Sequence, residues 1–272
     1  MDMRMKKIVI LLLMAGIAGS CSNSKYADSN RSYKKQAKAF ARELKTQPAG
    51  IDSVLMASPW VGTTNFGMRK PNFVIIHHTA QNACDSTLRT FTLPRTQVSA
   101  HYVICKDGTV HHMLNDYLRA WHAGAGRWGS LTDINSSSIG IELDNNGFEP
   151  FSEAQINSLL QVLKSLKKNY GIPTANFIGH ADIAPTRKVD PNRYFPWQQL
   201  AQKGFGNWYD TAMVKMIPDH FNAVQALRII GYDTRDSVAA IRAFKLHFVQ
   251  QDSIPKLTDA DRKILYDLYK RY

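Results

Sequence analysis

Residues 72–80 read NFVIIHHTA, and this stretch predicts the centre of the fold. Phe73 to Ile76 form a continuous apolar run with β-branched side chains, which indicates a buried strand. Two histidines follow directly. Because neighbouring side chains on a strand point to opposite faces, at most one of His77 and His78 can easily enter a given site. We therefore expect a central strand that ends in a candidate functional histidine.

Further strand signals lie on both sides of a long predicted helix. The clearest is HYVICKDGTVHHML at residues 101–114, where two β-rich segments joined through Asp-Gly are typical of a hairpin. SIGIEL at 138–143 predicts another strand, and an apolar run at 176–179 leads into a polar loop. Strands and helices in this order predict an α/β fold, with a mixed central β-sheet flanked by helices.

The helix predicted over residues 152–170 has signals at both ends. Its apolar residues repeat on one face, and Ser152 and Gln155 form a capping-box pattern at its start. Gly171 and Pro173 follow its last residue and end it. We expect this helix to cover one face of the sheet.

The composition changes after Asp210. Three helix-like segments follow, near residues 219–230, 236–249 and 258–271. We interpret them as a small three-helix domain. An extension packed on the main sheet is the alternative.

The first twenty residues have the layout of an export signal. A basic start, MDMRMKK, precedes the apolar run IVILLLMAGIA, which is too short to span a bilayer, and small residues then precede Cys21. This order resembles a bacterial lipobox, in which the cysteine is acylated and becomes the new N-terminus. Ala18 stands where Leu is commonest in that motif, so a soluble secreted product is the alternative.

The charge and composition limit the partners. Hydrophobic residues make up 44% and charged residues 21% of the 272-residue chain, which is ordinary for a soluble protein and excludes a multispanning membrane protein. The formal net charge is +12, and removal of residues 1–20 would leave +10 because three basic residues and one acidic residue go. Such a surface favours lipid headgroups or a carboxylate-bearing wall polymer. Export argues against nucleic acid.

Cysteine usage bears on the redox state and on metal binding. Of three cysteines, Cys84 and Cys105 remain if Cys21 is lipidated. We interpret these two as buried thiols, with a disulfide, which an oxidising compartment permits, as the alternative. No Cys-x-x-Cys pair occurs, so a metal site would be built from histidines and carboxylates.

Such a set exists. Residues 177–191 read FIGHADIAPTRKVDP and supply His180 and Asp190, which join His77 beyond apolar runs at one predicted sheet edge. Two imidazoles and one carboxylate leave the fourth tetrahedral position open, as in catalytic rather than structural zinc sites. Lys188 lies two residues before Asp190, so in extended chain both side chains share one face. Asp182 is interpreted as a cap of the turn.

The segments IIHHTA, SAHYVI, AWHAG, SIGIEL and GHADIAPTRKVDP occur in this order, over roughly residues 70–210. Together they resemble the bacterial zinc N-acetylmuramoyl-L-alanine amidases of the AmpD/AmiD kind, whose fold is shared with peptidoglycan recognition proteins. RIIGYDTRDSVAAIRAFKLHF, at residues 228–248, resembles the small helical peptidoglycan-binding-like domain of membrane-anchored members.

The resemblance implies cleavage of the amide between the lactyl group of muramic acid and the first L-alanine of the stem peptide. It implies Zn²⁺ bound by His77, His180 and Asp190, with Glu142 as the catalytic carboxylate and Lys188 stabilising the transition state. These roles agree with the chemistry, since zinc activates water and polarises a carbonyl, a carboxylate can move protons, and a cation stabilises an oxyanion.

Two further residues are candidates for substrate contacts. By the resemblance, His122 in AWHAG lies at the pocket wall beside the sugar-peptide junction, and a structural turn is the alternative. Arg187 could pair with a stem-peptide carboxylate, or form a plain surface salt bridge. Trp121, Trp128 and Trp197 could stack on sugars or belong to the core. His101 is interpreted as structural.

This sequence departs from the family pattern at two positions. Asn192 stands where many relatives have Gly, and His78 stands where several have Tyr. His78 could then contact a metal ligand from behind or lie at the rim of the site.

We therefore predict a signal peptide at 1–20, a tether with a basic helix at 21–55, a zinc amidase domain at 56–210 and the helical domain at 211–272. The expected partners are peptidoglycan or muropeptide substrate and a membrane, reached through the lipid on Cys21. We expect a monomer in the cell envelope, at the outer membrane facing the periplasm. A wall-binding module that does not cut and a zinc peptidase acting within stem peptides are the alternatives.

Overall fold

A computed structural model describes residues 25–46, 62–214, 216–252 and 254–272. The predicted signal peptide and the predicted lipidation site Cys21 lie outside the described residues. The chain divides into two compact units, residues 1–66 and 67–272, and each is described by itself. Within the described ranges, none of the helices has the length and apolar character needed to cross a membrane.

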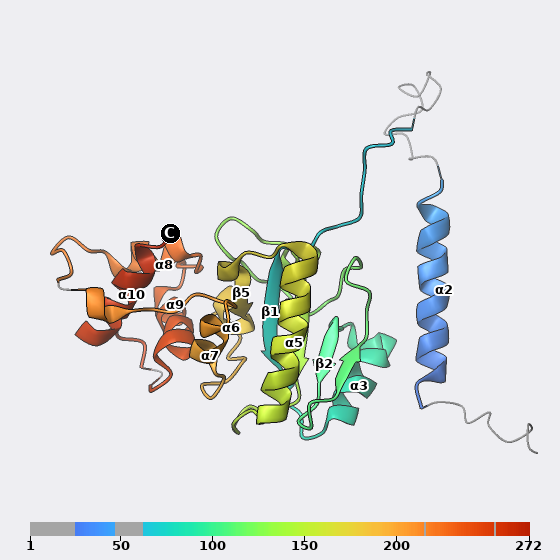
Figure 1. The fold of residues 1–272 in the computed structure, drawn as a ribbon, viewed down its shortest axis with the longest axis horizontal. Coiled ribbons are helices and arrows are strands. Elements are labelled where there is room, and N and C mark those ends of the chain that lie inside the picture. Colours follow the sequence, from blue (N-terminus) through green and yellow to red (C-terminus); the bar gives the residue numbers. More distant parts are fainter. Residues whose placement is uncertain (1–24, 47–61, 215, 253) are drawn as a thin grey trace, which may run out of the picture. The chain divides into compact units, whose positions relative to one another are not determined.

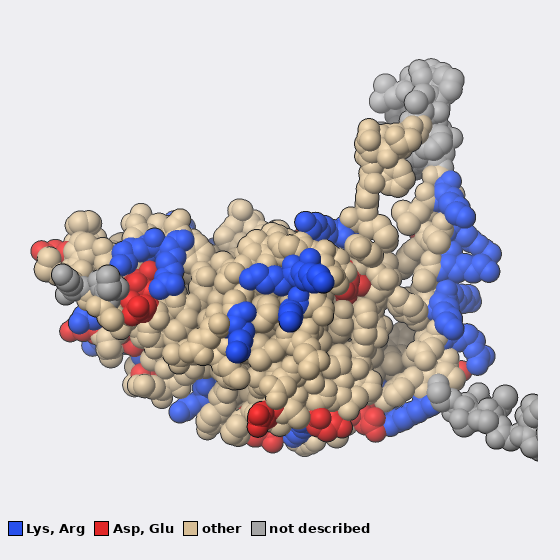
Figure 2. Space-filling model, viewed as in Figure 1, with Lys and Arg blue, Asp and Glu red and all other residues tan. Residues whose placement is uncertain are grey.

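The described part of the first unit consists mainly of α2 (Ala27–Glu43). This is the basic helix predicted within residues 21–55. No residue of α2 is buried, and Figure 2 shows Lys and Arg side chains along much of its length. Asp28 in its first turn and Arg42 in its last turn both suit the helix dipole.

The second unit is built on a five-stranded sheet in the order β3-β2-β4-β1-β5 (Figure 1). The strands, in chain order, are β1 (Phe73–His78), β2 (Tyr102–Ile104), β3 (Val110–His112), β4 (Ser138–Leu143) and β5 (Phe177–Gly179). The β2–β3 pair is antiparallel and every other pair is parallel. The predicted mixed sheet and the hairpin through Asp107-Gly108 are therefore confirmed.

The central strand β1 is buried because its apolar residues face layers on both sides. Val74, Ile75 and Ile76 have no exposed surface. Val74 and Ile76 belong to the core cluster under the long helix, whereas Ile75 packs with Ile134 and Ile183 in a second cluster. A strand buried on both faces needs a continuous apolar run, which is what the sequence has.

Helix α5 (Glu153–Tyr170) crosses one face of the sheet, as Figure 1 shows. Its inner side, including Leu159, Leu163 and Leu166, belongs to the sheet core. Its predicted end signals are confirmed, because Ser152 accepts a hydrogen bond from the Gln155 backbone N–H and Gly171 ends the helix in the left-handed conformation. The shorter helical segments of this part are α3 (Cys84–Thr92), η1 (Pro94–Thr96), α4 (Ile134–Ser137), η2 (Thr174–Asn176), α6 (His180–Ile183) and α7 (Trp197–Gln202).

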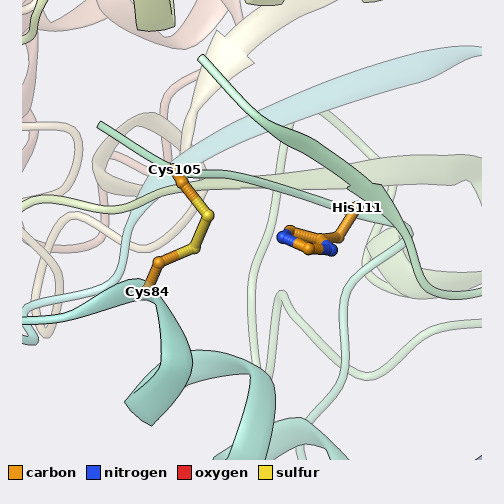
Figure 3. A group of neighbouring side chains, drawn as sticks. All are labelled: Cys84, Cys105 and His111. Atoms are coloured by element: carbon orange, nitrogen blue, oxygen red, sulfur yellow. A yellow bond between two sulfur atoms is a disulfide. The ribbon is translucent and has the colours of Figure 1, made fainter. Parts of the chain in front are cut away.

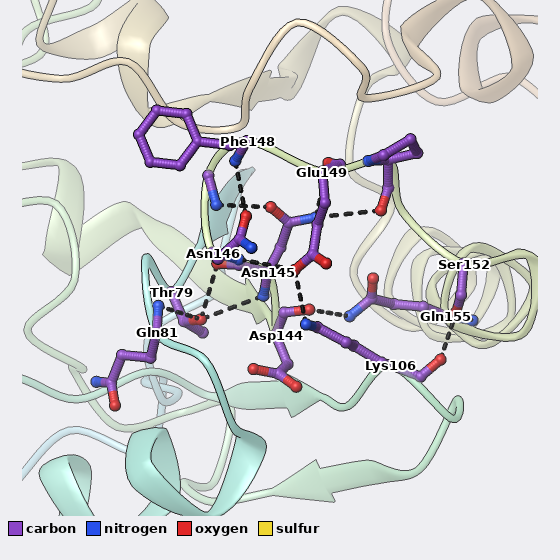
Figure 4. Close-up of polar contacts among 12 residues, drawn as sticks. Thr79, Gln81, Lys106, Asp144, Asn145, Asn146, Phe148, Glu149, Ser152 and Gln155 are labelled. Carbon is purple, nitrogen blue, oxygen red and sulfur yellow. Dashed lines mark hydrogen bonds and ion pairs between the residues drawn. The ribbon is translucent and has the colours of Figure 1, made fainter.

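The Gln155 side chain does not complete the predicted capping box. Its Nε2 donates instead to the carbonyls of Ile104 and Asp144, at 2.8 and 3.1 Å. Those carbonyls lie at the ends of β2 and β4, where the start of α5 packs (Figure 4). The buried side chain therefore satisfies sheet acceptors rather than its own helix.

The C-terminal part contains η3 (Thr211–Met213), α8 (Ala223–Ile230), α9 (Ser237–Phe244), the π-helical turn η4 (Lys245–Val249) and α10 (Asp259–Tyr269). The three predicted helices are thus present, and they share an apolar core of their own. Ala181 of α6 belongs to that same core, so the helices also pack directly against the end of the sheet-bearing part.

Cys84 and Cys105 form a disulfide, so the interpretation as two free thiols was wrong. Cys84 is the first residue of α3 and Cys105 directly follows β2, and their Cα atoms are 5.4 Å apart, within the range of a disulfide. His111 lies beside the bridge (Figure 3). Because the sulfurs are bonded to one another, this group offers no thiolate to a metal.

Candidate active site

Three parallel strands bring the predicted site residues to one edge of the sheet. His77 is the penultimate residue of β1, and His180 directly follows β5. In the β1–β4 register, His77 is opposite Glu142. Side chains of paired residues lie on the same face of a sheet, so the predicted catalytic carboxylate is beside the predicted ligand. Loops beyond the carboxyl ends of such strands are where open α/β sheets hold ligands.

The three predicted metal ligands form a compact, buried donor set. His77 Nδ1 lies 2.8 Å from His180 Nδ1, and Asp190 Oδ2 lies 3.1 Å from the first and 3.0 Å from the second. The residues are only 1%, 3% and 7% exposed in the order His77, His180, Asp190. Ligand atoms about 2.0–2.1 Å from a tetrahedral zinc are about 3.3 Å apart. The set therefore has the chemistry and nearly the spacing of a zinc site.

The second ring nitrogen of His180 fixes which atom is free for a metal. His180 Nε2 lies 3.1 Å from the carbonyl oxygen of Ala123, which can only accept a hydrogen bond. The proton of the neutral ring is therefore on Nε2. The lone pair of Nδ1 consequently points towards His77 and Asp190, where a metal would bind.

His77 is oriented by a longer chain of hydrogen bonds. Its Nε2 lies 3.1 Å from His122 Nδ1, and His122 Nε2 lies 3.2 Å from Ser138 Oγ. The Ser138 hydroxyl donates to the carbonyl of Ile134, at 2.6 Å. If each group donates to the next, every donor has an acceptor and His77 Nδ1 is left with a lone pair. The chain thus favours the tautomer that a metal requires.

His122 therefore lies behind His77, buried, with both ring nitrogens engaged. Its ring packs on Gly140 of β4 so closely that a Cβ at that position would lie 2.3 Å from the ring. This placement favours a role in orienting His77 over the direct substrate contact that the sequence predicted.

The protonation states also suit metal binding. Burial, and then the neighbouring His180, lower the pKa of His77 to about 4, so its ring is neutral at pH 7. Burial alone would raise the pKa of Asp190, but its side-chain contacts with His180 and His77 lower it overall. A neutral imidazole at His77 beside an ionised carboxylate at Asp190 is the combination that binds a metal.

Glu142 has a different environment. Its side chain is half-buried as a whole, but its Oε2 is buried and has no hydrogen-bond partner among the described residues. Burial, reinforced by the negative Asp190 and opposed by Lys188, raises the pKa of Glu142 to about 8 in the metal-free protein. A carboxyl group with such a pKa can exchange protons near neutrality.

Lys188 is half-buried on the loop between α6 and Asp190, and its charge acts on both Glu142 and His77. The neighbouring Arg187 side chain is used within the protein. Its Nε donates to the carbonyl of Ala125 at 2.9 Å, and its Nη2 donates to the carbonyls of Ala123 and Ala125. Arg187 therefore stabilises the loop that contains Ala123 and Ala125, and the Ala123 carbonyl in turn orients His180.

Comparison with known proteins identifies the family. Residues 67–193 match the family model for N-acetylmuramoyl-L-alanine amidase. The amidase AmiD of Escherichia coli K12 is 36% identical over 206 residues, which cover 64% of this chain and 74% of AmiD. The chain belongs to the N-acetylmuramoyl-L-alanine amidase family. The predicted enzyme class is thereby confirmed.

Shorter amidases match a smaller region. The 1,6-anhydro-N-acetylmuramyl-L-alanine amidase AmpD of Haemophilus influenzae is 38% identical over 104 residues, which cover 38% of this chain and 56% of AmpD.

Solved amidase structures share the predicted fold. E. coli AmiD, in complex with the substrate anhydro-N-acetylmuramic acid-L-Ala-D-γ-Glu-L-Lys, has a TM-score of 0.68 at 31% identity, covering 78% of this chain and 93% of that one. AmpDh3 of Pseudomonas aeruginosa also has a TM-score of 0.68, at 28% identity, covering 84% and 99%. The amidase fold with its C-terminal helices therefore extends over most of this chain.

The loop after β4 supports the amidase site through contacts that the sequence did not predict. Asn145 Nδ2 donates to the carbonyl of Glu149, and Lys106 forms an ion pair with Glu149 at 2.6 Å (Figure 4). Asn192 Nδ2 donates to Asn145 Oδ1 at 3.0 Å, and the Asn192 N–H donates to His78 Nδ1 at 3.1 Å. Asn192 thus links the segment after Asp190 to this loop.

The remaining aromatic and histidine candidates have diverse surroundings. Trp197 is buried in the sheet core, and Trp128 packs on the core of the C-terminal helices. Trp121, next to His122, is the exposed one of the three and remains a candidate for sugar stacking. His101 is fully buried and its Nδ1 accepts from the Gly140 N–H, which agrees with a structural role.

Proposed function

We propose that this amidase is a zinc enzyme that cuts the bond between N-acetylmuramic acid and L-alanine in soluble anhydro-muropeptides. The observation that carries the proposal is the buried group of His77, His180 and Asp190, called the metal triangle from here on, beside Glu142. Two nitrogens and one oxygen at this spacing fit zinc with one position open. Zinc bound there would supply a Lewis acid that activates water and polarises the amide carbonyl.

The protein's own groups would move the protons. Glu142 has a buried oxygen with no hydrogen-bond partner in the described part of the chain and a pKa of about 8, so it can take a proton from the attacking water and return it to the leaving nitrogen. Lys188, which faces the same charges, would stabilise the developing oxyanion. His122 and Arg187 would hold the ligands in position rather than bind the substrate.

The substrate class is supported by the relatives. E. coli AmiD has been solved with anhydro-N-acetylmuramic acid-L-Ala-D-γ-Glu-L-Lys, and P. aeruginosa AmpDh3 with an anhydromuramic pentapeptide. Both structures cover most of this chain. We therefore expect the same class of fragment to be cut here.

The test is incubation of the purified chain with a defined anhydro-muropeptide, the matching reduced muropeptide and intact sacculi. Products are identified by mass, before and after removal of metal and re-addition of Zn²⁺. Free stem peptide with an intact L-alanine amine, lost with the metal and restored by zinc, supports the proposal. Undiminished cleavage by metal-free protein, or cleavage within the peptide, contradicts it.

We further propose attachment to the cell envelope through a lipid on Cys21, at the outer membrane facing the periplasm. The N-terminal sequence and the Cys84–Cys105 disulfide support export from a reducing compartment. Mass spectrometry of the mature N-terminus tests the anchor. A diacylated or triacylated Cys21 is expected, whereas an unmodified mature terminus contradicts it.

A further inference from the structure

Asp182 lies on α6, two residues after His180, and does more than cap its turn. Its carboxylate is 1% exposed. Oδ2 accepts the backbone N–H of Gly179 at 2.7 Å, which is the predicted cap. The two oxygens also accept hydrogen bonds from side chains far along the sequence. A buried carboxylate requires several donors, and here only one of them comes from its own loop.

The other donors come from the C-terminal helices. The Tyr232 hydroxyl, just after α8, donates to Asp182 Oδ1 at 2.7 Å. His247 Nδ1, on the turn η4, donates to Oδ2, also at 2.7 Å. Tyr232 and His247 are 2% and 4% exposed. The contact therefore excludes water, and the His247 ring is held further by stacking on Trp197 with centroids 3.8 Å apart.

Helix α6 consequently has two sides with different partners. His180 faces His77 and Asp190, whereas Ala181 packs in the core of the C-terminal helices and Asp182 bonds to them. The Ala181 N–H also donates to the carbonyl of Asp190 at 2.8 Å. The four-residue helix α6 thus connects His180, which it carries, and Asp190, which its Ala181 contacts, to residues of the C-terminal part.

We propose that Tyr232 and His247, acting through Asp182, are positioning residues for the metal ligands His180 and Asp190. The C-terminal helices are then part of the catalytic centre, in addition to any affinity for the cell wall. This inference rests on the proposed zinc site. The role proposed for Tyr232 and His247 differs from general packing, because both side chains donate hydrogen bonds to Asp182 on α6, the helix that carries His180.

The same C-terminal part offers a matched control. Lys245, two residues before His247, is also buried and forms ion pairs with Asp252 at 2.6 Å and Asp261 at 3.2 Å. None of these three residues belongs to α6 or to the metal triangle. Lys245→Met removes a buried cation and its two ion pairs from the helices and leaves the contacts of Asp182 unchanged.

The experiment uses the full-length protein and four variants, Tyr232→Phe, His247→Phe, His247→Asn and Lys245→Met. Asn presents an amide N–H near the place of the histidine Nδ1–H, whereas Phe keeps a stacked ring without a donor. Three quantities are measured: the Kd for Zn²⁺ by chelator competition, the visible spectrum of the Co²⁺-loaded protein, and the thermal midpoint of the metal-free protein.

We expect Tyr232→Phe and His247→Phe to bind zinc about 10–100-fold more weakly and to change the Co²⁺ spectrum, as loss of a ligand's supporting contacts does elsewhere. His247→Asn and Lys245→Met should bind zinc like the wild type, although Lys245→Met lowers the thermal midpoint. Unchanged zinc affinity in both Phe variants overturns the inference, and so does an equal loss in Lys245→Met or His247→Asn. A wild type that binds no zinc contradicts the proposed function instead.

Discussion

At the scale of single residues, the proposed metal ligands and the proposed catalytic carboxylate have different hydrogen-bond surroundings. The nitrogens of His77 and His180 that face away from the metal triangle lie 3.1 Å from His122 and from the Ala123 carbonyl. Glu142, in contrast, has a buried oxygen with no partner among the described residues. An unsatisfied buried polar atom costs stability, and its place beside the proposed metal ligands agrees with the catalytic role proposed for Glu142.

Glu142→Gln should keep the metal and lose the reaction. Gln has the shape of Glu but cannot accept and return a proton at neutral pH, and general acid–base catalysis contributes about 10²–10⁴-fold. We expect kcat to fall by that range, with the zinc content unchanged by elemental analysis. His180→Ala is the control, which should lose both zinc and activity. A Glu142→Gln variant with full kcat would show that another group moves the proton.

His122→Phe separates the two roles considered for His122. If His122 orients His77, its loss weakens zinc binding about 10–100-fold with little change in KM once zinc is saturating. If it binds substrate, KM rises while the Kd for zinc stays the same. We expect the first result, measured by chelator competition and by kinetics in excess zinc.

The metal-free protein should show the pH dependence that Glu142 implies. Its pKa is about 8 in the folded protein and has the ordinary value of 4.5 in the unfolded chain, so its protonation favours folding below pH 4.5. That contribution is lost as the pH rises towards 8, at about 1.4 kcal/mol per pH unit at most. We expect metal-free wild type to lose stability relative to Glu142→Gln over this window, measured by urea unfolding. A pH-independent difference contradicts the raised pKa.

At the scale of elements, the strands, the hairpin and α5 were predictable because their signals are local. An apolar run, an Asp-Gly turn and a Ser cap with a Gly stop each act within a few residues. Contacts between distant elements were not predictable. Gln155 satisfies the ends of two strands, and Asp182 is bonded to Tyr232, fifty positions away. The spacing of residues in the sequence predicts neither of these contacts.

The candidate site was predictable where its residues follow strand signals, and not where contacts join distant segments. His77, His180 and Asp190 could be grouped because each follows a strand signal, and the structure brings them together. The position of His122 behind His77 could not be foreseen, because it lies in a segment without periodicity. The disulfide was missed for the same reason, since nothing local places the start of α3 against the end of β2.

Removal of the disulfide should affect stability but not chemistry. The bridge closes a loop of 21 residues between α3 and the end of β2, and neither cysteine belongs to the metal triangle. Loops of this length correspond to about 3 kcal/mol in the chain-entropy model. We expect Cys84→Ser with Cys105→Ser to lower the free energy of unfolding by about that amount, measured in urea, with unchanged zinc Kd. A loss of zinc affinity would tie the bridge to the site.

At the scale of the whole molecule, the chemistry lies within the second compact unit. All residues of the metal triangle, their supporting contacts and the C-terminal helices belong to residues 67–272. The first unit offers a basic helix with no buried residue. Its composition suits attraction to an anionic surface, whereas the catalytic unit has the buried core needed to fold.

A chain of residues 67–272 should therefore cut a soluble anhydro-muropeptide with the kcat/KM of the chain that begins at residue 25. The longer chain should bind anionic vesicles or sacculi more tightly at low ionic strength, and added salt should reduce that advantage because exposed charges are screened. Sedimentation with vesicles and kinetics on the soluble substrate test the two statements. A large fall in kcat/KM would place part of the active site before residue 67.

The register of β1 against β4 limits how this enzyme can vary. His77 and Glu142 share a face only because they are directly paired. Side chains alternate along a strand, so the insertion of one residue within either strand would turn one of the two groups to the opposite face. The connection between these strands, residues 79–137, and the connection from β4 to β5, residues 144–176, are free of that restriction. Length changes should therefore accumulate in the connections, while the two strands keep a fixed residue count.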